Sequence, residues 1–380
     1  MARHAAGRTD GGERGGGRIV NRRAATGSLL ALTVAVLGCA GRAREERAAA
    51  ERAAAAEAAA SADEPTALPP NSPYVVVLGT AQDGGLPHLG CEKECCTAAR
   101  RDPARRRLVT SLLLCDPRDG RRWLFDCTPD LRAQMDLARS HPATRVMEGP
   151  RPALLDGLFL THAHMGHYGG LLELGREAYA VKGLATWLTP RFADYLRTNG
   201  PWRLLAEEGR LDLQAIDPGR AIELAPDLRV RCFRVPHRDE FSDTVGFLID
   251  GPNRDLLYLP DIDKWEAFDA WEPPLAEPGE PANGGIRTIE AAIAAVDVAL
   301  IDGCFFADGE IAGRSMKEIP HPFIAESIAR FAALPAAERE KVFFTHLNHT
   351  NAAATRGGAA WKSVVAAGMH VLDDGRLFGL

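Results

Sequence analysis

Three histidines stand close together in the segment LFLTHAHMGHYGG, residues 158–170: His162, His164 and His167. The chain of 380 residues has only 11 histidines, so three within six positions are an unusual concentration. Imidazole nitrogens bind Zn, Mn and Fe well, and imidazoles close together are typical of a metal site. His162 and His164 are two residues apart, so their rings project to the same side of an extended segment. The segment therefore predicts a metal-binding site.

Further metal-binding side chains follow apolar runs elsewhere in the chain. His237 follows LRVRCFRVP, Asp261 ends DLLYLPD, and His346 lies in KVFFTHL. With the histidines of 162–167 they offer one metal three ring nitrogens, and they can complete a second metal position. A site with fewer protein ligands than coordination positions leaves room for water or substrate, as a catalytic metal requires.

Short apolar runs predict the strands that must position these side chains. Strands are expected at 74–81, 111–116, 122–127, 157–164, 228–235, 244–250, 255–261, 298–303 and 341–347. Helices are expected at 169–180, 286–295, 322–333 and 355–366. The turn PRDG makes the second and third strands a hairpin. The pattern indicates an α/β protein of stacked layers, with sheets inside and helices outside.

Polar side chains recur at the carboxyl ends of these strands: Asp126, His162, His164, His237, Asp261, Asp302 and His346. Loops converge at such a rim and often form a functional site there. We expect Asp126 to orient a ligand histidine by a hydrogen bond and not to bind the metal itself.

The amino-terminal region has the features of an export signal. Arg22 and Arg23 precede the apolar run 29–37, which is too short to span a bilayer but suits the core of a signal peptide. The run ends in VLGCA, which resembles the lipobox of bacterial lipoproteins, with Cys39 as the lipidated residue. A plain cleaved signal or a single anchoring helix is the alternative. We expect residues 1–39 to be a lipoprotein-type signal peptide, which places the protein in the bacterial cell envelope.

The rest of the chain divides into a tether and a folded domain. Residues 40–73 are rich in Ala, Glu and Arg and then Pro, and they lack an apolar face, so they predict a tether. Residues 74–380 are expected to form one domain. Residues 1–26 carry six arginines against two acidic residues, which leaves a net charge of −10 on the remainder of the chain. A region with this net negative charge lacks the excess of Lys and Arg that binding to nucleic-acid phosphates requires. We therefore exclude nucleic acid as a general partner.

The motifs THAHMGH, LGTAQDGGLPHLGCEKECC, LFDCTPDL, PHRDEFSDTVG and HLNHTN resemble those of the metallo-β-lactamase superfamily, in the branch of coenzyme PQQ synthesis protein B. The resemblance covers about residues 74–351. It implies a four-layer αββα sandwich with the site at one rim. It implies a first metal bound by His162, His164 and His237, and a second bound by His167, Asp261 and His346. Asp261 would bridge both metals and take part in catalysis.

Two further expectations come from the same resemblance. His321, in EIPHPF, corresponds to a late histidine that contacts the scissile group in related phosphodiesterases, although a histidine in a surface loop is the alternative. Gly166 occupies the aspartate position of the superfamily pattern H-x-H-x-D-H. The loss of that anionic ligand favours a single metal or a weakly bound second one.

Relatives carry a structural zinc on closely spaced cysteines, and the corresponding residues here are Cys91, Cys95, Cys96 and His349. The spacing C-x3-C-C departs from the C-x-C-x2-C of the relatives, and Cys95 is the ligand that this departure affects. A disulfide among these cysteines is the alternative, because a lipoprotein matures outside the cytoplasm. With Cys39 lipidated, the seven remaining cysteines cannot all pair. We therefore favour zinc.

These observations predict a metal-dependent hydrolase that acts on a small ester or phosphodiester through metal-activated water. One or two divalent metals are expected at the active site, Zn first and Fe or Mn as alternatives. A metal-dependent oxidation or a transport role in PQQ biosynthesis is a second hypothesis. A non-catalytic metal- or ligand-binding lipoprotein of the envelope is a third. The expected partners are a small-molecule substrate and a membrane, the latter through the lipid anchor at Cys39.

Overall fold

The structure is a computed structural model of the chain, and it describes residues 71–140, 153–273, 282–313, 315–316 and 319–380. The predicted signal peptide and residues 40–70 of the predicted tether lie outside the described residues. Within the described ranges, no helix has the length and apolar character that crossing a bilayer requires. The last two residues of the predicted tether, Ser72 and Pro73, are hydrogen-bonded to Leu380 at the other end of the chain.

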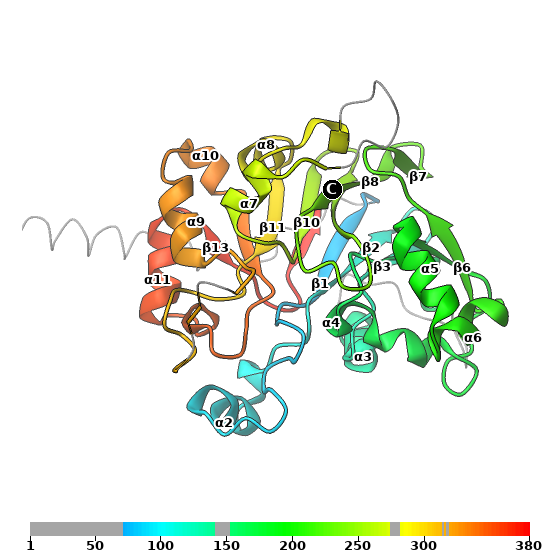
Figure 1. Cartoon of the computed structure of the whole chain (residues 1–380), viewed down its shortest axis with the longest axis horizontal. Coiled ribbons are helices and arrows are strands. Elements are labelled where there is room, and N and C mark those ends of the chain that lie inside the picture. The colour runs from blue at the N-terminus through cyan, green and yellow to red at the C-terminus, as the bar shows by residue number, and fades with distance from the viewer. Residues whose placement is uncertain (1–70, 141–152, 274–281, 314, 317–318) are drawn as a thin grey trace, which may run out of the picture. The chain divides into compact units, whose positions relative to one another are not determined.

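Two mixed sheets form the interior of the described part (Figure 1). Each sheet has seven strands. The first sheet has the order β14 (Leu377–Gly379), β1 (Tyr74–Gly79), β2 (Ser111–Asp116), β3 (Arg121–Phe125), β4 (Gly157–Phe159), β5 (Leu184–Leu188) and β6 (Leu211–Ala215). The second has the order β13 (His370–Val371), β12 (Val342–Thr345), β11 (Val298–Asp302), β10 (Asp255–Leu259), β9 (Thr244–Asp250), β8 (Leu228–Val235) and β7 (Ala221–Ala225). The predicted hairpin is β2–β3, which pair antiparallel.

A buried apolar layer joins the two sheets face to face. Phe125 and Phe159 of the first sheet stack at a centroid distance of 4.8 Å, and Phe247 of the second sheet meets both edge-on. Such aromatic packing excludes water between the sheets and contributes about 1 kcal/mol per pair beyond the buried area. The strands alternate, so their other side chains point outward to the helices.

Helices cover the outer faces of both sheets (Figure 1). The first sheet packs against α3 (Leu131–Ser140), α5 (Pro190–Thr198) and α6 (Trp202–Glu207). The second packs against α7 (Trp265–Ala270), α8 (Ile289–Ala294), α9 (Ile324–Phe331) and α11 (Ala359–Ala366). The other α-helices of the described residues are α2 (Glu94–Arg101), α4 (Met165–Tyr168) and α10 (Ala336–Arg339). The arrangement is αββα, and the predicted fold class is confirmed.

The segment after β4 differs from the prediction. A strand at 157–164 and a helix at 169–180 were expected, but the strand ends at Phe159 and a 3-10 helix spans Gly169–Leu174. The strand ends early because the amide of Thr161 donates to the side chain of Asp126 and not to a neighbouring strand. A Cβ on Gly170 would lie 2.0 Å from the carbonyl oxygen of Thr128, so this segment packs directly on the loop after β3. Tertiary contacts therefore override the helical pattern.

Two strand ends hold an unusual backbone conformation at the rim where the loops meet. Asp126 follows β3 with φ 63°, and His346 follows β12 with φ 58°. Residues other than glycine rarely adopt this left-handed conformation, and they keep it only where the surrounding structure enforces it. The side chains of both residues are completely buried at this rim, next to the histidines of 162–167.

Candidate metal centre

The carboxylate of Asp261, in the loop after β10, lies at the centre of a group of histidines. Ring nitrogens of six histidines approach it: His162 (3.3 Å), His164 (3.9 Å), His167 (3.8 Å), His237 (3.2 Å), His321 (3.2 Å) and His346 (3.8 Å). His237 and His321 approach Oδ1, and the other four approach Oδ2. All six predicted active-site ligands are therefore in one place, with Asp261 between the two sets of histidines.

Four of these histidines have one ring nitrogen held by an outer partner. The pairs are His162 Nδ1 with Thr161 Oγ1 (3.0 Å), His164 Nε2 with Glu240 Oε2 (2.9 Å), His167 Nδ1 with Asp126 Oδ2 (2.8 Å), and His237 Nδ1 with Asp263 Oδ1 (3.2 Å). The other nitrogen of each ring faces Asp261. Metal-binding histidines are oriented in this way in proteins, because the outer hydrogen bond fixes the ring and its tautomer.

The inward-facing atoms have no hydrogen-bond partner, although they are buried. They are His162 Nε2, His164 Nδ1, His167 Nε2, His237 Nε2, His346 Nε2, Asp261 Oδ1 and Asp83 Oδ1. Buried polar atoms are nearly always paired, so a convergent set of unpaired nitrogen and oxygen atoms requires an explanation. Ligand atoms of His162, His164, His237 and Asp261 all lie within 4.8 Å of one another, which is close enough to share one ion. The donor set fits a divalent metal.

The electrostatics of the centre also suit a cation. Burial lowers the pKa of His162 and of His346 well below the usual value, so both rings are neutral and able to bind metal. Burial alone would raise the pKa of Asp261, but His237 and His321, whose own pKa values are raised, hold it well below its usual range. Asp261 is therefore an ionised carboxylate in a buried site.

The pKa values of His167 and His237 are raised, in contrast to those of His162 and His346. Burial acts to lower their pKa values, but nearby carboxylates outweigh it: Asp126 raises the pKa of His167 to about 9, and Asp261 raises that of His237 to about 10. A metal that binds these two nitrogens has to displace a proton from each, so metal binding releases protons.

Asp83 belongs to the centre, and the sequence analysis missed it. It lies in the loop after β1, and its Oδ1 is 3.6 Å from Nε2 of His167. Asp83, His167 and His346 form a further group whose ligand atoms lie within 4.8 Å of one another. The segment QDGG reads as a turn, and no periodicity connects position 83 with positions 167 and 346. The signal that could have found it is the position of an acidic residue in the loop after the first predicted strand.

His321 is buried beside Asp261 and does not lie on a surface loop. Its Nδ1 is 2.8 Å from Oδ2 of Asp302, the last residue of β11. Asp302 also accepts hydrogen bonds from the amides of Ile262 and Cys304, which fix the carboxylate. His321 therefore stands at the edge of the metal centre with one ring nitrogen held in place.

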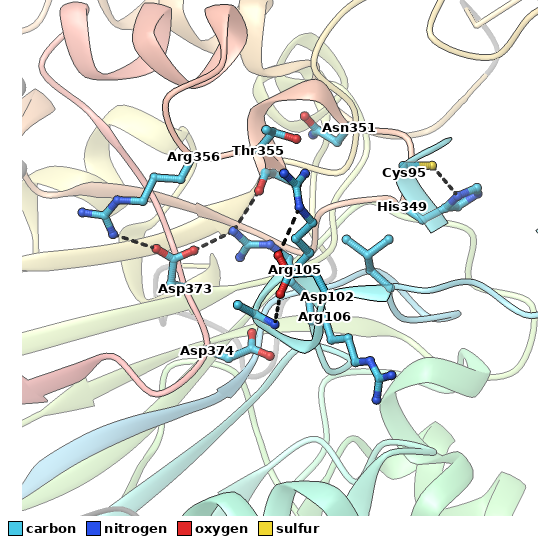
Figure 2. Close-up of a pocket in the computed structure, with 14 residues that line it drawn as sticks. Cys95, Asp102, Arg105, Arg106, His349, Asn351, Thr355, Arg356, Asp373 and Asp374 are labelled. Atoms are coloured by element: carbon cyan, nitrogen blue, oxygen red, sulfur yellow. Dashed lines mark hydrogen bonds and ion pairs between the residues drawn. The ribbon is translucent and has the colours of Figure 1, made fainter. Parts of the chain in front are cut away.

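The predicted cysteine site is also assembled. Cys91, Cys95, Cys96 and His349 have ligand atoms within 4.8 Å of one another. The Sγ atoms of Cys95 and Cys96 are 3.9 Å apart, and Nδ1 of His349 lies 3.7 Å and 3.3 Å from them (Cys95 and His349 in Figure 2). A disulfide has an S–S distance near 2.05 Å, so these sulfurs are not bonded in the structure. Sulfurs 3.9 Å apart suit two corners of a tetrahedral zinc site.

A cavity of about 480 Å³ lies beside the cysteine site, with Cys95 and His349 in its lining (Figure 2). Four arginines line it: Arg105 pairs with Asp102, Arg107 and Arg356 share Asp373, and Arg106 donates to the backbone carbonyls of Ala99 and Arg100. We assign the chemistry to the histidine centre, where the unpaired buried donors are.

Comparison with known proteins agrees with this geometry. Residues 121–347 match the family model described as the beta-lactamase superfamily domain. The coenzyme PQQ synthesis protein B of Methylobacterium radiotolerans is 30% identical over 322 residues, which cover 79% of this chain and 98% of that protein. The protein of the same name from Methylorubrum extorquens is 27% identical over 321 residues, covering 80% and 98%.

Two solved structures share the fold. The zinc-bound PqqB from Methylobacterium extorquens has a TM-score of 0.65 at 24% identity and covers 81% of this chain and 100% of its own. A diphosphatase of the PhnP family has a TM-score of 0.53 at 18% identity, covering 81% and 97%. The matched domain, the 30% identical relative and the assembled histidine centre lead to one assignment: the chain belongs to the metallo-β-lactamase superfamily, in the branch of coenzyme PQQ synthesis protein B.

Proposed function

We propose that the protein is a metal-dependent hydrolase that acts on a small ester or phosphodiester. The observation that carries the proposal is the convergence of unpaired, buried nitrogen and oxygen atoms on Asp261. A divalent metal bound there lowers the pKa of water toward ~7 and polarises a carbonyl or phosphoryl oxygen. Zinc is our first choice of metal, because the donors are mostly imidazole nitrogens.

The residues of the chain divide the work between holding the metal and handling the substrate. His162, His164 and His237 hold the first ion, and Asp261 reaches both sets of histidines. Glu240 fixes the ring of His164 and Asp263 that of His237, so the ligands are positioned before substrate arrives. Such preorganisation lowers the cost of reaching the transition state.

We assign His321 to the scissile group of the substrate. Asp302 holds its Nδ1, which leaves Nε2 to face a substrate oxygen. Burial acts to lower the pKa of His321, but Asp302 and Asp261 outweigh it and raise the value. A positioned imidazole that can carry a proton is suited to stabilising a developing negative charge or to protonating a leaving oxygen.

Exposed apolar side chains next to the centre favour a substrate with an apolar part. Met165 follows His164 directly and is 57% exposed, and Phe241 follows Glu240 and is 51% exposed. Glu240 and His164 are in contact, so the segments that carry both side chains meet at the centre. Phe241 also stacks on Tyr195 at a centroid distance of 5.0 Å. We propose that Met165 and Phe241 contact the apolar part of the substrate.

A second candidate is a metal-dependent oxidation in the synthesis of a quinone cofactor. The likeness to coenzyme PQQ synthesis protein B, at 30% identity over most of the chain, is the observation that favours it. The fold alone does not decide between these reactions, because function depends on the site.

The test is to assay purified protein with bis(p-nitrophenyl) phosphate and p-nitrophenyl acetate after loading with Zn, Mn or Fe. We expect metal-dependent turnover that is lost in His164→Ala, with Arg118→Ala on the β2–β3 turn as the control. Turnover that consumes oxygen with Fe, and no hydrolysis with any metal, would support the second candidate. Stoichiometric metal at the histidine centre without turnover of any probe would support a non-catalytic binding protein.

We also propose that the protein is anchored to a bacterial membrane by a lipid on Cys39. The support is the sequence from Arg22 to Cys39, which lies outside the described residues. Two lipid chains on one residue provide stable anchoring. A Cys39→Ala variant should move from the membrane fraction to the soluble fraction. Membrane association as tight as that of the wild type would overturn this proposal.

A further inference from the structure

Gly166 is the second residue of α4 and stands where the superfamily pattern has an aspartate. Its backbone is helical, and it is absent from the residues with positive φ, so the backbone conformation does not require glycine. A Cβ at this position would lie 2.0 Å from Oδ1 and 2.7 Å from Cα of Asp83. Any side chain at position 166 would therefore collide with Asp83. The carboxylate of Asp83 occupies the space that a side chain at 166 would take.

The loop of Asp83 is tied to the segment that carries His346. The amide of Gln82 donates to the carbonyl of Leu347, and the amide of Leu347 donates to the carbonyl of Thr80. These bonds hold position 83 in a fixed register with position 346. The side chain of Gln82 donates to Oδ2 of Asp83 at 2.9 Å, which orients the carboxylate and leaves Oδ1 toward the centre.

Oδ1 of Asp83 faces the two histidines that the first metal does not use. It lies 3.6 Å from Nε2 of His167. Asp83, His167 and His346 each have a ligand atom within 4.8 Å of the other two, which is close enough to bind one ion. All three ligand atoms are buried and have no hydrogen-bond partner in the structure. Oδ2 of Asp261 is 3.8 Å from the Nε2 atoms of both histidines.

We propose that Asp83 is a ligand of a second divalent cation, together with His167, His346 and the bridging carboxylate of Asp261. The carboxylate that the motif lacks at position 166 thus comes from the loop after β1. This restores two anionic ligands and two imidazoles, a set that binds Zn, Mn or Fe. The inference rests on the metal centre of the proposed function, but it does not depend on which reaction the centre catalyses.

This arrangement changes what a substitution at position 166 should do. From the sequence alone, Gly166→Asp is expected either to restore a lost ligand and raise the metal content, or to lower stability because the glycine is needed for a positive φ or for a close approach of the substrate. In the structure the new side chain would displace Asp83, including its backbone. We therefore expect Gly166→Ala and Gly166→Asp to lower the affinity for the second ion.

The experiment is a Zn²⁺ titration of the full chain by isothermal calorimetry, with metal content measured by mass spectrometry. Wild type should bind two ions at the histidine centre in addition to any ion at the cysteines. Asp83→Asn has the same shape without the charge, and it should weaken one of the two ions by at least about tenfold. Gly166→Ala should give the same loss from a different position. Asp130→Asn, which removes a half-buried carboxylate bonded to the amide of Val109, is the matched control and should bind both ions normally.

Two results would overturn the inference: one ion at the histidine centre of the wild type, or unchanged affinity for both ions in Asp83→Asn. Asp83→Ser gives the same reading if the asparagine variant does not fold, as judged by circular dichroism without metal. Failure of the proposed function is distinguishable. Two ions bound without hydrolysis would overturn the hydrolase and leave the role of Asp83 intact, whereas hydrolysis with a single ion would do the reverse.

Discussion

Nδ1 of His167 lies 2.8 Å from Oδ2 of Asp126, and both side chains are completely buried. Asp126 itself is held by the amide and hydroxyl of Thr161 and by the hydroxyl of Tyr258. The contact fixes the ring of His167 with Nε2 toward Asp261. The left-handed backbone of Asp126 places its carboxylate beside Nδ1 of His167, the ring nitrogen that does not face Asp261.

Asp126→Asn should therefore weaken metal binding without removing a ligand. The loss of a carboxylate that orients a metal-binding histidine typically costs 10–100-fold in metal affinity, and we expect a loss in about that range. Competition with a chromogenic chelator measures it. Tyr258→Phe keeps the carboxylate and loses one hydrogen bond to it, so its affinity should stay close to that of the wild type. Equal affinities for Asp126→Asn and wild type would contradict this role.

The sequence predicted the layers and, apart from Asp83, the side chains that gather around Asp261, but not the shape of the loop around them. Strand-end residues such as His237 and His346 could be found because an apolar run precedes each of them. Asp83 also follows an apolar run, but nothing in the sequence connects it with His167, because their contact joins segments that are far apart in the chain. The expected helix at 169–180 was wrong for a related reason: close packing of Gly170 on Thr128 is not visible in a helical pattern.

Substitution of a cysteine tests the predicted zinc site at the cysteines. If Cys91, Cys95, Cys96 and His349 bind zinc, Cys95→Ser should lose one zinc ion per chain and melt several degrees earlier, because a structural metal stabilises the fold. Cys95 is the informative position, since the spacing departs there from that of the relatives. Cys115→Ala, in β2, should keep the full zinc content. The zinc assignment fails if Cys95→Ser keeps the full metal content or if thiol titration shows a disulfide.

Truncation of Phe241 tests the apolar face beside the metal centre. Phe241→Ala should raise KM several-fold for an ester with an apolar group and leave kcat nearly unchanged, because it removes binding that is uniform along the reaction. The control is Leu204→Ala, an exposed leucine of α6 on the outer face of the first sheet. Steady-state kinetics with esters of increasing chain length measure the effect. The same KM for short and long chains in wild type and variant would show that Phe241 does not contact substrate.

The stability of the protein should depend on pH through Asp374. Burial raises the pKa of this carboxyl from 3.8 to about 6, although Arg107 acts in the opposite direction. An acid with a raised pKa contributes stability below its unfolded value, and that contribution is lost as pH rises through about 6. The side chain at this position cannot ionise in the Asp374→Asn variant. As the pH rises from about 4.5 to about 7, the free energy of unfolding of this variant should therefore increase by on the order of 1 kcal/mol relative to that of the wild type. The increase is modest because the carboxyl is partly exposed to solvent.

Urea unfolding of chelator-treated protein at the two pH values measures this difference. The amide keeps one acceptor for the hydrogen bonds from Thr80 and Leu108, so part of the effect of the substitution is independent of pH. We attribute to the ionisation of the carboxyl only the part of the difference in unfolding free energy, variant minus wild type, that changes with pH. An identical difference at both pH values would contradict the assignment.

Leu380 is completely buried, and its backbone is bonded on both sides. Its amide donates to the carbonyl of Pro73, and its carbonyl accepts from the side chains of Ser72 and Asn253. Any polypeptide fused after Leu380 has to leave from inside this arrangement and open the edge of the first sheet, where β14 pairs with β1. A purification tag or fluorescent reporter is therefore better inserted at an exposed turn such as Asp119, whereas a carboxyl-terminal fusion should fold less efficiently.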